Sequence, residues 1–271
     1  MGEAKQRQSA TQKFVAQYPD CCFCGGIRPA VTREHMPPKA LFDSSHRPDK
    51  LVMPACDECN RGTSTADLVA AVMSRWGYDI SVKEGRDHFK LVNRVRRQAP
   101  KIVEEWNEYI DPAEARKHLE NHGVGVPHNA GFATIGPLTI CQLNAFAHKA
   151  VLALYFEHFR KLLPNEGRVF ALWRSKEDYA QGVPSLLLQM MQRYGTLEQG
   201  TWNTKEIFEY RYELNEAEGL FACLARLRGG LFVSGFAASD ASVIKEVPTD
   251  EWIKPEDLLK IMHDPTFQKR Q

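Results

Sequence analysis

Two Cys-x-x-Cys pairs constrain what this chain can fold into more than any other feature of its sequence. Cys21 and Cys24 form the first pair, and Cys56 and Cys59 form the second. Zinc prefers four tetrahedral ligands and binds thiolates well, and each Cys-x-x-Cys turn supplies two sulfurs. The spacing therefore predicts a structural zinc ion that closes the segment between the pairs into a loop-rich module.

The other cysteines are predicted to have packing roles. Cys22 can replace Cys21 as a ligand only by closing a shorter Cys-x-Cys loop, which is poorer geometry for a metal knuckle. Cys141 and Cys223 lie in apolar stretches, where a free thiol behaves as a small hydrophobic group. The alternative, that the paired cysteines are also ordinary buried thiols, is disfavoured because this spacing is rarely accidental.

The net charge of the chain excludes a general attraction to nucleic acid. It is +1 over 271 residues, so any such attraction must come from a local patch. The N-terminal segment lacks the apolar core of a signal peptide, and the most apolar run, 150–156, is too short to span a bilayer. We expect a cytoplasmic protein without a membrane partner.

Hydrophobic periodicity predicts several helices. Residues 63–77 carry apolar side chains at helical spacing, and Gly77 is a stop signal. Further helices are predicted at 3–17, at 86–109 with an interruption at Pro100, at 112–121 and at 255–262.

A longer helix is predicted over 140–163. It is apolar on most faces, and its narrow polar strip contains Lys149, Glu157 and Lys161. A helix of this kind usually forms the buried centre of a domain, so His148 and His158 are expected to be core histidines.

An antiparallel sheet is predicted in the last third of the chain. Apolar and alternating runs predict strands at 168–173, 206–214, 220–227 and 231–237. The Arg-Gly-Gly segment at 228–230 fits a tight hairpin turn, and the polar residues around it are expected to be ordinary sheet surface.

The predicted fold class is α+β with two parts. A zinc-stapled module over 1–80 is followed by a helical and α+β domain over 81–271, which carries the antiparallel sheet. The boundary is expected near 78–85, where the chain is polar and contains glycine.

A Glu-His pair lies between the two cysteine pairs. Glu34 and His35 precede two prolines, and Asn60 directly follows Cys59. Closing the zinc site can bring the Glu34 region near Asn60. Carboxylate and amide oxygens suit Mg²⁺, and a neutral imidazole beside such a metal can take a proton from an attacking water. The alternative is a solvated loop acid beside a surface or core histidine.

The order Cys-x-x-Cys, Glu-His-x-x-Pro and Cys-x-x-Cys-Asn resembles that of the HNH, or ββα-metal, endonucleases, and is nearest to their zinc-stapled, endonuclease VII-like branch. The likeness covers residues 18–77. It implies that Glu34 and Asn60 hold a catalytic Mg²⁺ or Mn²⁺ and that His35 is the general base. Pro38 matches the family's proline three residues after that histidine.

Two positions depart from the family pattern. The family usually has an asparagine before a Leu-Val pair, which fixes the loop bearing the general base, and Lys50 stands there in this chain. Thr63 replaces a lysine that often follows the Cys-Asn motif. The resemblance implies an endonuclease that hydrolyses phosphodiester bonds, with DNA expected before RNA. The alternative is a catalytically degenerate, zinc-containing nucleic-acid-binding or regulatory protein, and homodimerisation is left open.

Basic residues in two regions are candidates for contacting phosphates. Those near the Glu-His pair are Arg33, Lys39, Lys50 and Arg61, and those on one stripe of the helix after residue 85 are Arg86, Lys90, Arg94, Arg97 and Lys101. The alternative for the stripe is a solvated helix face, as most charge runs are. A set of three histidines has metal-ligand spacing but sits at a helix end, where histidine is favourable in any case: His118, His122 and His128.

Overall fold

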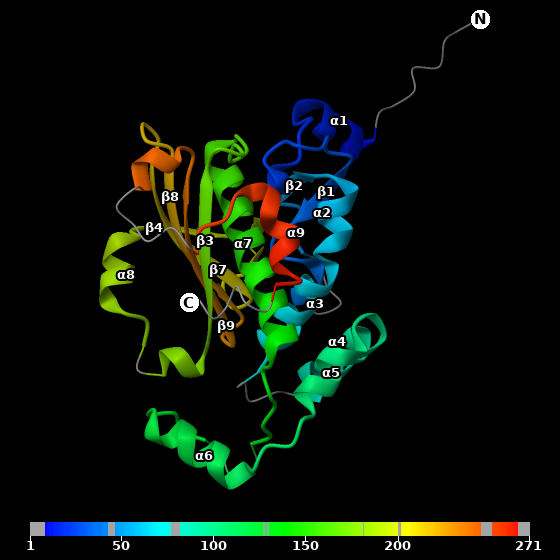
Figure 1. Ribbon diagram of the computed structural model, residues 1–271, viewed down its shortest axis with the longest axis vertical. Coiled ribbons are helices and arrows are strands. Elements are labelled where there is room, and N and C mark those ends of the chain that lie inside the picture. Colours follow the sequence, from blue (N-terminus) through cyan, green and yellow to red (C-terminus); the bar gives the residue numbers. More distant parts are fainter. Residues whose placement is uncertain are drawn as a thin grey trace, which may run out of the picture.

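The structure is a computed structural model that describes residues 9–42, 47–76, 82–126, 128, 130–180, 182–199, 202–244 and 251–264, without the side chains of 82–84, 86, 199 and 202. Helices and antiparallel sheets both occur, which confirms the α+β class. A long helix, α7 (Pro137–Phe159), lies between an N-terminal layer on one side and a five-stranded sheet on the other (Figure 1).

The N-terminal layer contains a β-hairpin followed by helices. Its elements are α1 (Ala10–Gln17), η1 (Cys22–Cys24), β1 (Thr32–His35), η2 (Lys39–Leu41), β2 (Val52–Ala55), α2 (Asp57–Gly62) and α3 (Ser64–Met73). Strands β1 and β2 are antiparallel, with Glu34 opposite Met53 and His35 opposite Val52. The helix predicted over 63–77 is confirmed as α3. The hairpin therefore leads directly into the helix that carries Asn60.

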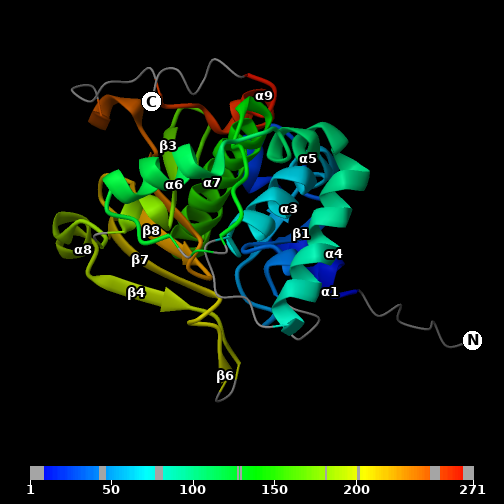
Figure 2. The same ribbon diagram turned by 90° about the horizontal axis from the view of Figure 1, so that it is seen from below.

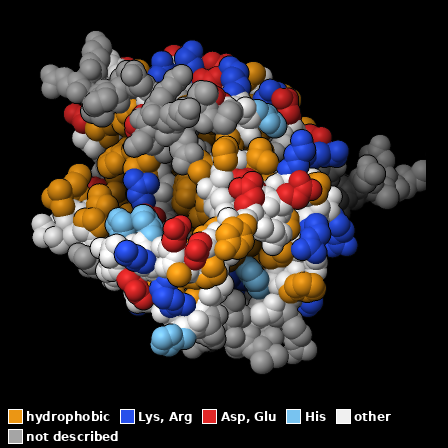
Figure 3. Space-filling view, turned by 60° about the horizontal axis from the view of Figure 1, so that its bottom comes forward, with side chains coloured by type: hydrophobic (Ala, Val, Ile, Leu, Met, Phe, Trp, Pro, Cys, Tyr) orange, Lys and Arg blue, Asp and Glu red, His pale blue; other side chains and the backbone are white. Residues whose placement is uncertain are grey.

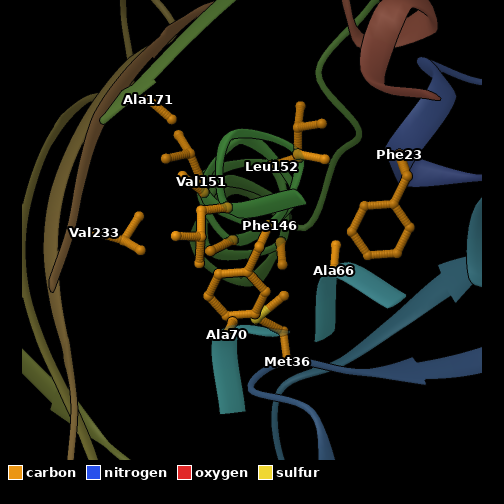
Figure 4. Packing of buried hydrophobic residues seen from close by; sticks show 14 of the residues in the cluster. Phe23, Met36, Ala66, Ala70, Phe146, Val151, Leu152, Ala171 and Val233 are labelled. Carbon is orange, nitrogen blue, oxygen red and sulfur yellow. The ribbon is translucent and has the colours of Figure 1, made fainter. Parts of the chain in front are cut away.

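Helix α7 forms the buried centre of the molecule. All its residues from 141 to 156 are buried, because one side faces α3 and the other faces the sheet. Figure 4 shows Phe146 and Leu152 among Ala66, Ala70 and other residues of the N-terminal layer, with Val151 toward the sheet. The predicted central helix is confirmed, but Lys149 does not lie on a solvated strip, since its side chain is 0% exposed.

The large sheet has the strand order β3-β9-β8-β7-β4 and is antiparallel throughout. Its strands are β3 (Arg168–Ser175), β4 (Arg193–Thr196), β7 (Phe208–Asn215), β8 (Leu220–Leu227) and β9 (Leu231–Ala238). The four predicted strands are confirmed. Gly235 of β9 has a packing reason, because a Cβ there would lie 2.4 Å from Val151 Cγ2. Glycine thus allows α7 to approach the sheet closely.

The turn between β8 and β9 contacts the N-terminal layer, so the prediction of ordinary sheet surface around it is wrong. Arg228 is 9% exposed and donates from Nε to the carbonyl oxygen of Leu41 at 3.0 Å. The amide of Gly230 donates to the carbonyl oxygen of Ser74 at 3.1 Å. The hairpin turn is present as predicted, but it packs against the end of α3 and the loop that follows His35.

The remaining elements lie around these layers. They are α4 (Val82–Gln98), α5 (Pro100–Trp106), α6 (Pro112–Asn121), η3 (Glu177–Tyr179), α8 (Ser185–Met190), β5 (Glu198–Gln199), β6 (Trp202–Asn203), η4 (Ala241–Ile244), η5 (Pro255–Asp257) and α9 (Leu258–Ile261). Pro100 begins α5, as the predicted interruption requires. Helix α4 packs against α3 (Figure 2). None of the described helices is long and apolar enough to cross a membrane.

One cluster of buried hydrophobic residues extends across all three layers. It includes Phe23 and Met53 of the N-terminal layer, Phe146 of α7 and Val233 of the sheet. Residues 77–81, where the predicted boundary begins, lie outside the described part of the chain. The division at residue 80 stays a prediction, but the core on its two sides is continuous.

His158 at the end of α7 gives the fold a predicted pH dependence. It stacks on Tyr212 at a centroid distance of 3.8 Å, and burial lowers the pKa of His158 from 6.5 to about 4. Its contribution is complete above pH 6.5 and is lost as pH falls toward 4, because the unfolded chain then binds a proton that the folded chain does not. Replacing His158→Phe should reduce the loss of unfolding free energy between pH 7 and 5 by up to about 2 kcal/mol.

Urea unfolding followed by circular dichroism at several pH values measures this difference. His118→Phe, at an exposed position of α6, is the matched control and should follow the wild type. Equal pH slopes for His158→Phe and the wild type would contradict the prediction.

Candidate functional site

Four cysteine sulfurs meet at the base of the β-hairpin. The Sγ atoms of Cys21, Cys24, Cys56 and Cys59 all lie within 4.8 Å of one another. This grouping confirms that Cys21, and not Cys22, belongs to the set. All four residues are buried, and four thiolates at this spacing could hold a metal ion such as zinc.

Local backbone geometry explains how each knuckle presents its sulfurs. After the first pair, Gly25 and Gly26 have φ values of 63° and 83°, a region that glycine adopts without steric cost. Gly26 then donates its amide to the carbonyl oxygen of Cys21 at 3.0 Å. In the second pair the Cys59 amide donates to Cys56 Sγ at 3.3 Å, at the start of α2.

The sulfur cluster requires a cation to balance its charge. Hydrogen bonds from Cys21 and Cys59 lower the pKa of Cys24 to about 2, because they stabilise its thiolate. The hydrogen bond with Cys24 in turn raises the pKa of Cys21 to about 12. Successive thiolates therefore repel one another, and a bound divalent cation would remove that repulsion.

Glu34 and His35 end strand β1 and point to opposite faces of the hairpin, as neighbouring strand residues do. Glu34 is buried on the face toward α7, whereas His35 is half-buried on the other face. Arg33 and His35 share that second face, and both contact the carboxylate of Asp49. The pair predicted as one site therefore divides between two surroundings.

Glu34 belongs to a buried charge cluster. The Nζ atom of Lys149 lies 2.5 Å from Glu34 Oε1 and 2.7 Å from Asp67 Oδ2. Burial raises the pKa of Asp67 to about 7 although Lys149 opposes this, while Lys149 itself has a raised pKa because the two carboxylates outweigh its burial. Glu34 Oε2 makes no hydrogen bond and is not among the buried oxygens without a partner, so it remains accessible to solvent.

His35 lies in a partly buried, positively charged environment. Its side chain is 20% exposed, and Nε2 is 3.5 Å from Asp49 Oδ1. Burial, followed by the charges of Arg47 and Lys39, lowers the pKa of His35 to about 4. The imidazole is therefore neutral at pH 7 and able to accept a proton.

Asn60 lies in α2, which packs against β1, and its side chain is half-buried. Its amide donates to the carbonyl oxygen of Cys56 as part of the second knuckle. Within the described part of the chain, no hydrogen bond links the side chains of Asn60 and Glu34. The fold brings the two elements together, but the direct partner of Glu34 is Lys149.

Arg47 organises the loop between His35 and β2. Its guanidinium donates to four carbonyl oxygens, those of Met36 and Pro37 at 2.8 Å, Pro48 at 2.6 Å and Leu51 at 3.4 Å. These bonds span both ends of the loop. Lys50, the residue that departs from the family pattern, is exposed and is not needed to hold this loop.

The predicted phosphate-binding residues differ in availability. Arg33 is held by Asp49 at 2.8 Å, Arg61 pairs with Asp57 at 2.7 Å, and Lys90 pairs with Asp87 at 2.9 Å. The exposed cations are Lys39, Lys50, Arg94, Arg97 and Lys101, while the side chain of Arg86 lies outside the described residues. Lys90, Arg94 and Arg97 line a shallow hollow on α4 with Asn93 and Arg96. Lys and Arg side chains gather on the side of the face in Figure 3 on which Figure 2 places α4.

The histidines at 118, 122 and 128 do not form a metal site with one another. The cysteine cluster is the one group of three or more His, Cys, Asp or Glu side chains close enough for a metal within the described ranges. The His122 ring instead contacts the carbonyl oxygen of His118 at 2.8 Å.

Sequence reasoning missed the residues that surround Glu34 and His35. These are Asp67, Lys149, Arg47 and Asp49. A lysine within an apolar helix was a usable signal, because an unpaired buried ammonium is costly. Its partners lie 82 and 115 residues away in the sequence, and no local pattern identifies them.

The metal prediction is tested by composition. We expect about one zinc ion per chain in protein purified without chelator, because the four sulfurs match a closed tetrahedral site. Cys59→Ser should lose most of this zinc and unfold at lower temperature. Cys22→Ala, at a buried position outside the cluster, should retain it. Elemental analysis of the three proteins is the measurement, and full zinc content in Cys59→Ser would contradict the assignment.

The role of Arg47 predicts opposite outcomes for two loop variants. Arg47→Lys should lower the free energy of unfolding by about 2 kcal/mol, because a single ammonium cannot serve four carbonyl groups that the guanidinium reaches. Lys50→Asn should stay within about 0.5 kcal/mol of the wild type, as exposed substitutions usually do. Urea unfolding measures both. A larger loss for Lys50→Asn than for Arg47→Lys would show that Lys50 holds the loop.

Comparisons with known proteins do not assign a family to this arrangement. No protein-family model matches the chain, and searches of curated proteins and of solved structures also give no match. Any role for these residues therefore rests on their own geometry and chemistry.

Proposed function

We propose that the protein is a metal-dependent endonuclease of the HNH, or ββα-metal, type that hydrolyses phosphodiester bonds in nucleic acid. One observation carries this proposal. The hairpin that ends in Glu34-His35 and the helix that bears Asn60 are fastened to each other by the same four-cysteine cluster. A strand-end acid, a neighbouring histidine and a helix-borne amide, supported in this way, are the donor set that the chemistry needs.

The oxygen donors of the site suit a hard divalent cation. Glu34 presents Oε2 to solvent, and Asn60 has an amide side chain that is partly exposed. Mg²⁺ or Mn²⁺ binds oxygen ligands and keeps several waters, so two protein ligands are sufficient. When bound, such an ion polarises the phosphate and neutralises the leaving oxygen.

The state of His35 suits a general base. The low pKa of the ring leaves it neutral at pH 7, and its partial exposure leaves it open to an attacking water. Asp49 contacts the ring at Nε2 and can orient it, as a carboxylate does for many catalytic histidines. The Arg47 hydrogen bonds hold the loop that follows His35, a role given to an asparagine in the HNH family.

Basic residues near the site suit a nucleic-acid substrate. The side chain of Gln98, at the end of α4, donates to the hydroxyls of Ser64 and Thr65 at 2.8 and 2.9 Å, only a few residues after Asn60. This contact fastens the helix that carries Arg94 and Arg97 to the start of α3. Exposed cations on one helix face neutralise backbone phosphates, which supply most non-specific affinity. We expect DNA to be the preferred substrate.

A second function is favoured by the ion pair at Glu34. Lys149 already neutralises one oxygen of this carboxylate, which weakens its attraction for a divalent cation. The protein would then be a zinc-containing nucleic-acid-binding protein without catalysis. Both functions require the cysteine cluster and the basic helix, and they differ in whether phosphodiester bonds are broken.

Cleavage assays separate the two functions. The full chain is incubated with plasmid DNA and with single-stranded RNA, in Mg²⁺ or Mn²⁺. His35→Ala and Glu34→Gln should each lose at least about 100-fold in rate, because they remove the proton acceptor and a metal ligand. His118→Ala, an exposed histidine of α6, should cut as the wild type does.

Other outcomes identify the alternatives. Salt-sensitive binding without cutting would support the non-catalytic protein. Neither binding nor cutting would contradict both functions. Cutting that survives His35→Ala unchanged would show that a contaminating nuclease or another site is responsible.

A further inference from the structure

The buried ammonium of Lys149 joins two carboxylates from different elements. It comes from α7 and contacts Glu34 of β1 and Asp67 of α3, and both carboxylate side chains are 12% exposed. It also lies 5.6 Å from the ring centroid of Phe23, which sits between the two sulfurs of the first knuckle. The charge cluster thus borders the cysteine cluster as well as the end of strand β1.

The two carboxylates differ in what they can reach. Asp67 Oδ1 is buried without a hydrogen-bond partner, whereas Glu34 Oε2 is accessible to solvent. A cation from solution can therefore approach Glu34 but not Asp67. Asp67 faces the ammonium alone.

The charges of the cluster add up to one excess negative charge. Lys149 contributes one positive charge and the ionised carboxylates contribute two negative charges. Asp67 balances the ammonium, so Glu34 retains a charge that a divalent cation can use. At these separations, inside a protein, each interaction is much stronger than it would be in water.

We infer that Lys149 and Asp67 are positioning residues for a metal ion held by Glu34. Lys149 fixes Oε1 so that Oε2 faces solvent, and Asp67 offsets the ammonium so that it does not compete with the incoming cation. This inference rests on the proposed function. It extends the site beyond the segment between the cysteines, because Lys149 belongs to the central helix.

Binding of Mn²⁺ to the full chain tests the inference without any cleavage assay. Asp67→Asn should weaken Mn²⁺ binding at pH 8 by at least about tenfold, because an unbalanced ammonium then lies against Glu34. The double variant Lys149→Met/Asp67→Asn should bind at least about threefold more tightly than Asp67→Asn alone, because the competing charge is gone. Electron paramagnetic resonance of free Mn²⁺ measures each dissociation constant.

Three controls make the outcomes separable. Asp57→Asn removes an exposed acid of α2 and should bind Mn²⁺ as the wild type does. Glu34→Gln should abolish the site, and zinc content with circular dichroism reports whether each variant is folded. If Asp67→Asn does not fold, Asp67→Ser removes the same charge and carries the same expectation.

Two results would overturn the inference. One is a folded Asp67 variant whose Mn²⁺ affinity equals that of the wild type, and the other is a double variant that binds as weakly as Asp67→Asn. In both cases Glu34→Gln would still lose binding, so the proposed function would stand. If the wild type and Glu34→Gln bind Mn²⁺ equally, the proposed metal site is absent and both ideas fail.

Discussion

The buried ion pair between Lys149 and Glu34 is the interaction on which the arrangement of the site depends. It joins the central helix to the hairpin, and Asp67 makes it a three-membered cluster. Removing one partner of such a cluster leaves an uncompensated buried charge, which typically costs about 3–5 kcal/mol. Packing alone could hold α7 between its two layers in several registers. The charge cluster favours the register in which one ammonium meets two carboxylates.

Local patterns in the sequence were sufficient for most of the fold and for the metal cluster. Apolar periodicity identified α3, α7 and the strands of the sheet, because each buries a regular face against one neighbour. The cysteine spacing identified the four sulfurs, since a knuckle is a local structure. Features of this kind need no knowledge of what lies across the core.

The surroundings of Glu34 and His35 were beyond such reasoning. Lys149 was expected on a polar strip because lysine is rarely buried, and only tertiary contacts with distant carboxylates reverse that expectation. The role of Arg47 was missed because a residue in an irregular loop carries no periodic signal. Arg228 was similarly expected at a surface, but the turn that holds it packs against Leu41. Each error concerns a cation whose partner is remote in sequence.

The continuous core has a consequence for how such a chain can change by recombination. The cysteine-stapled segment has the sequence of a portable unit, yet α3 presents its apolar face to α7 and the β8–β9 turn caps the end of α3. Moved to another protein without these partners, the segment would expose that face and leave Glu34 and Asp67 without their ammonium. The unit that can be inherited as a working whole is therefore the three-layered body, and not the stapled segment.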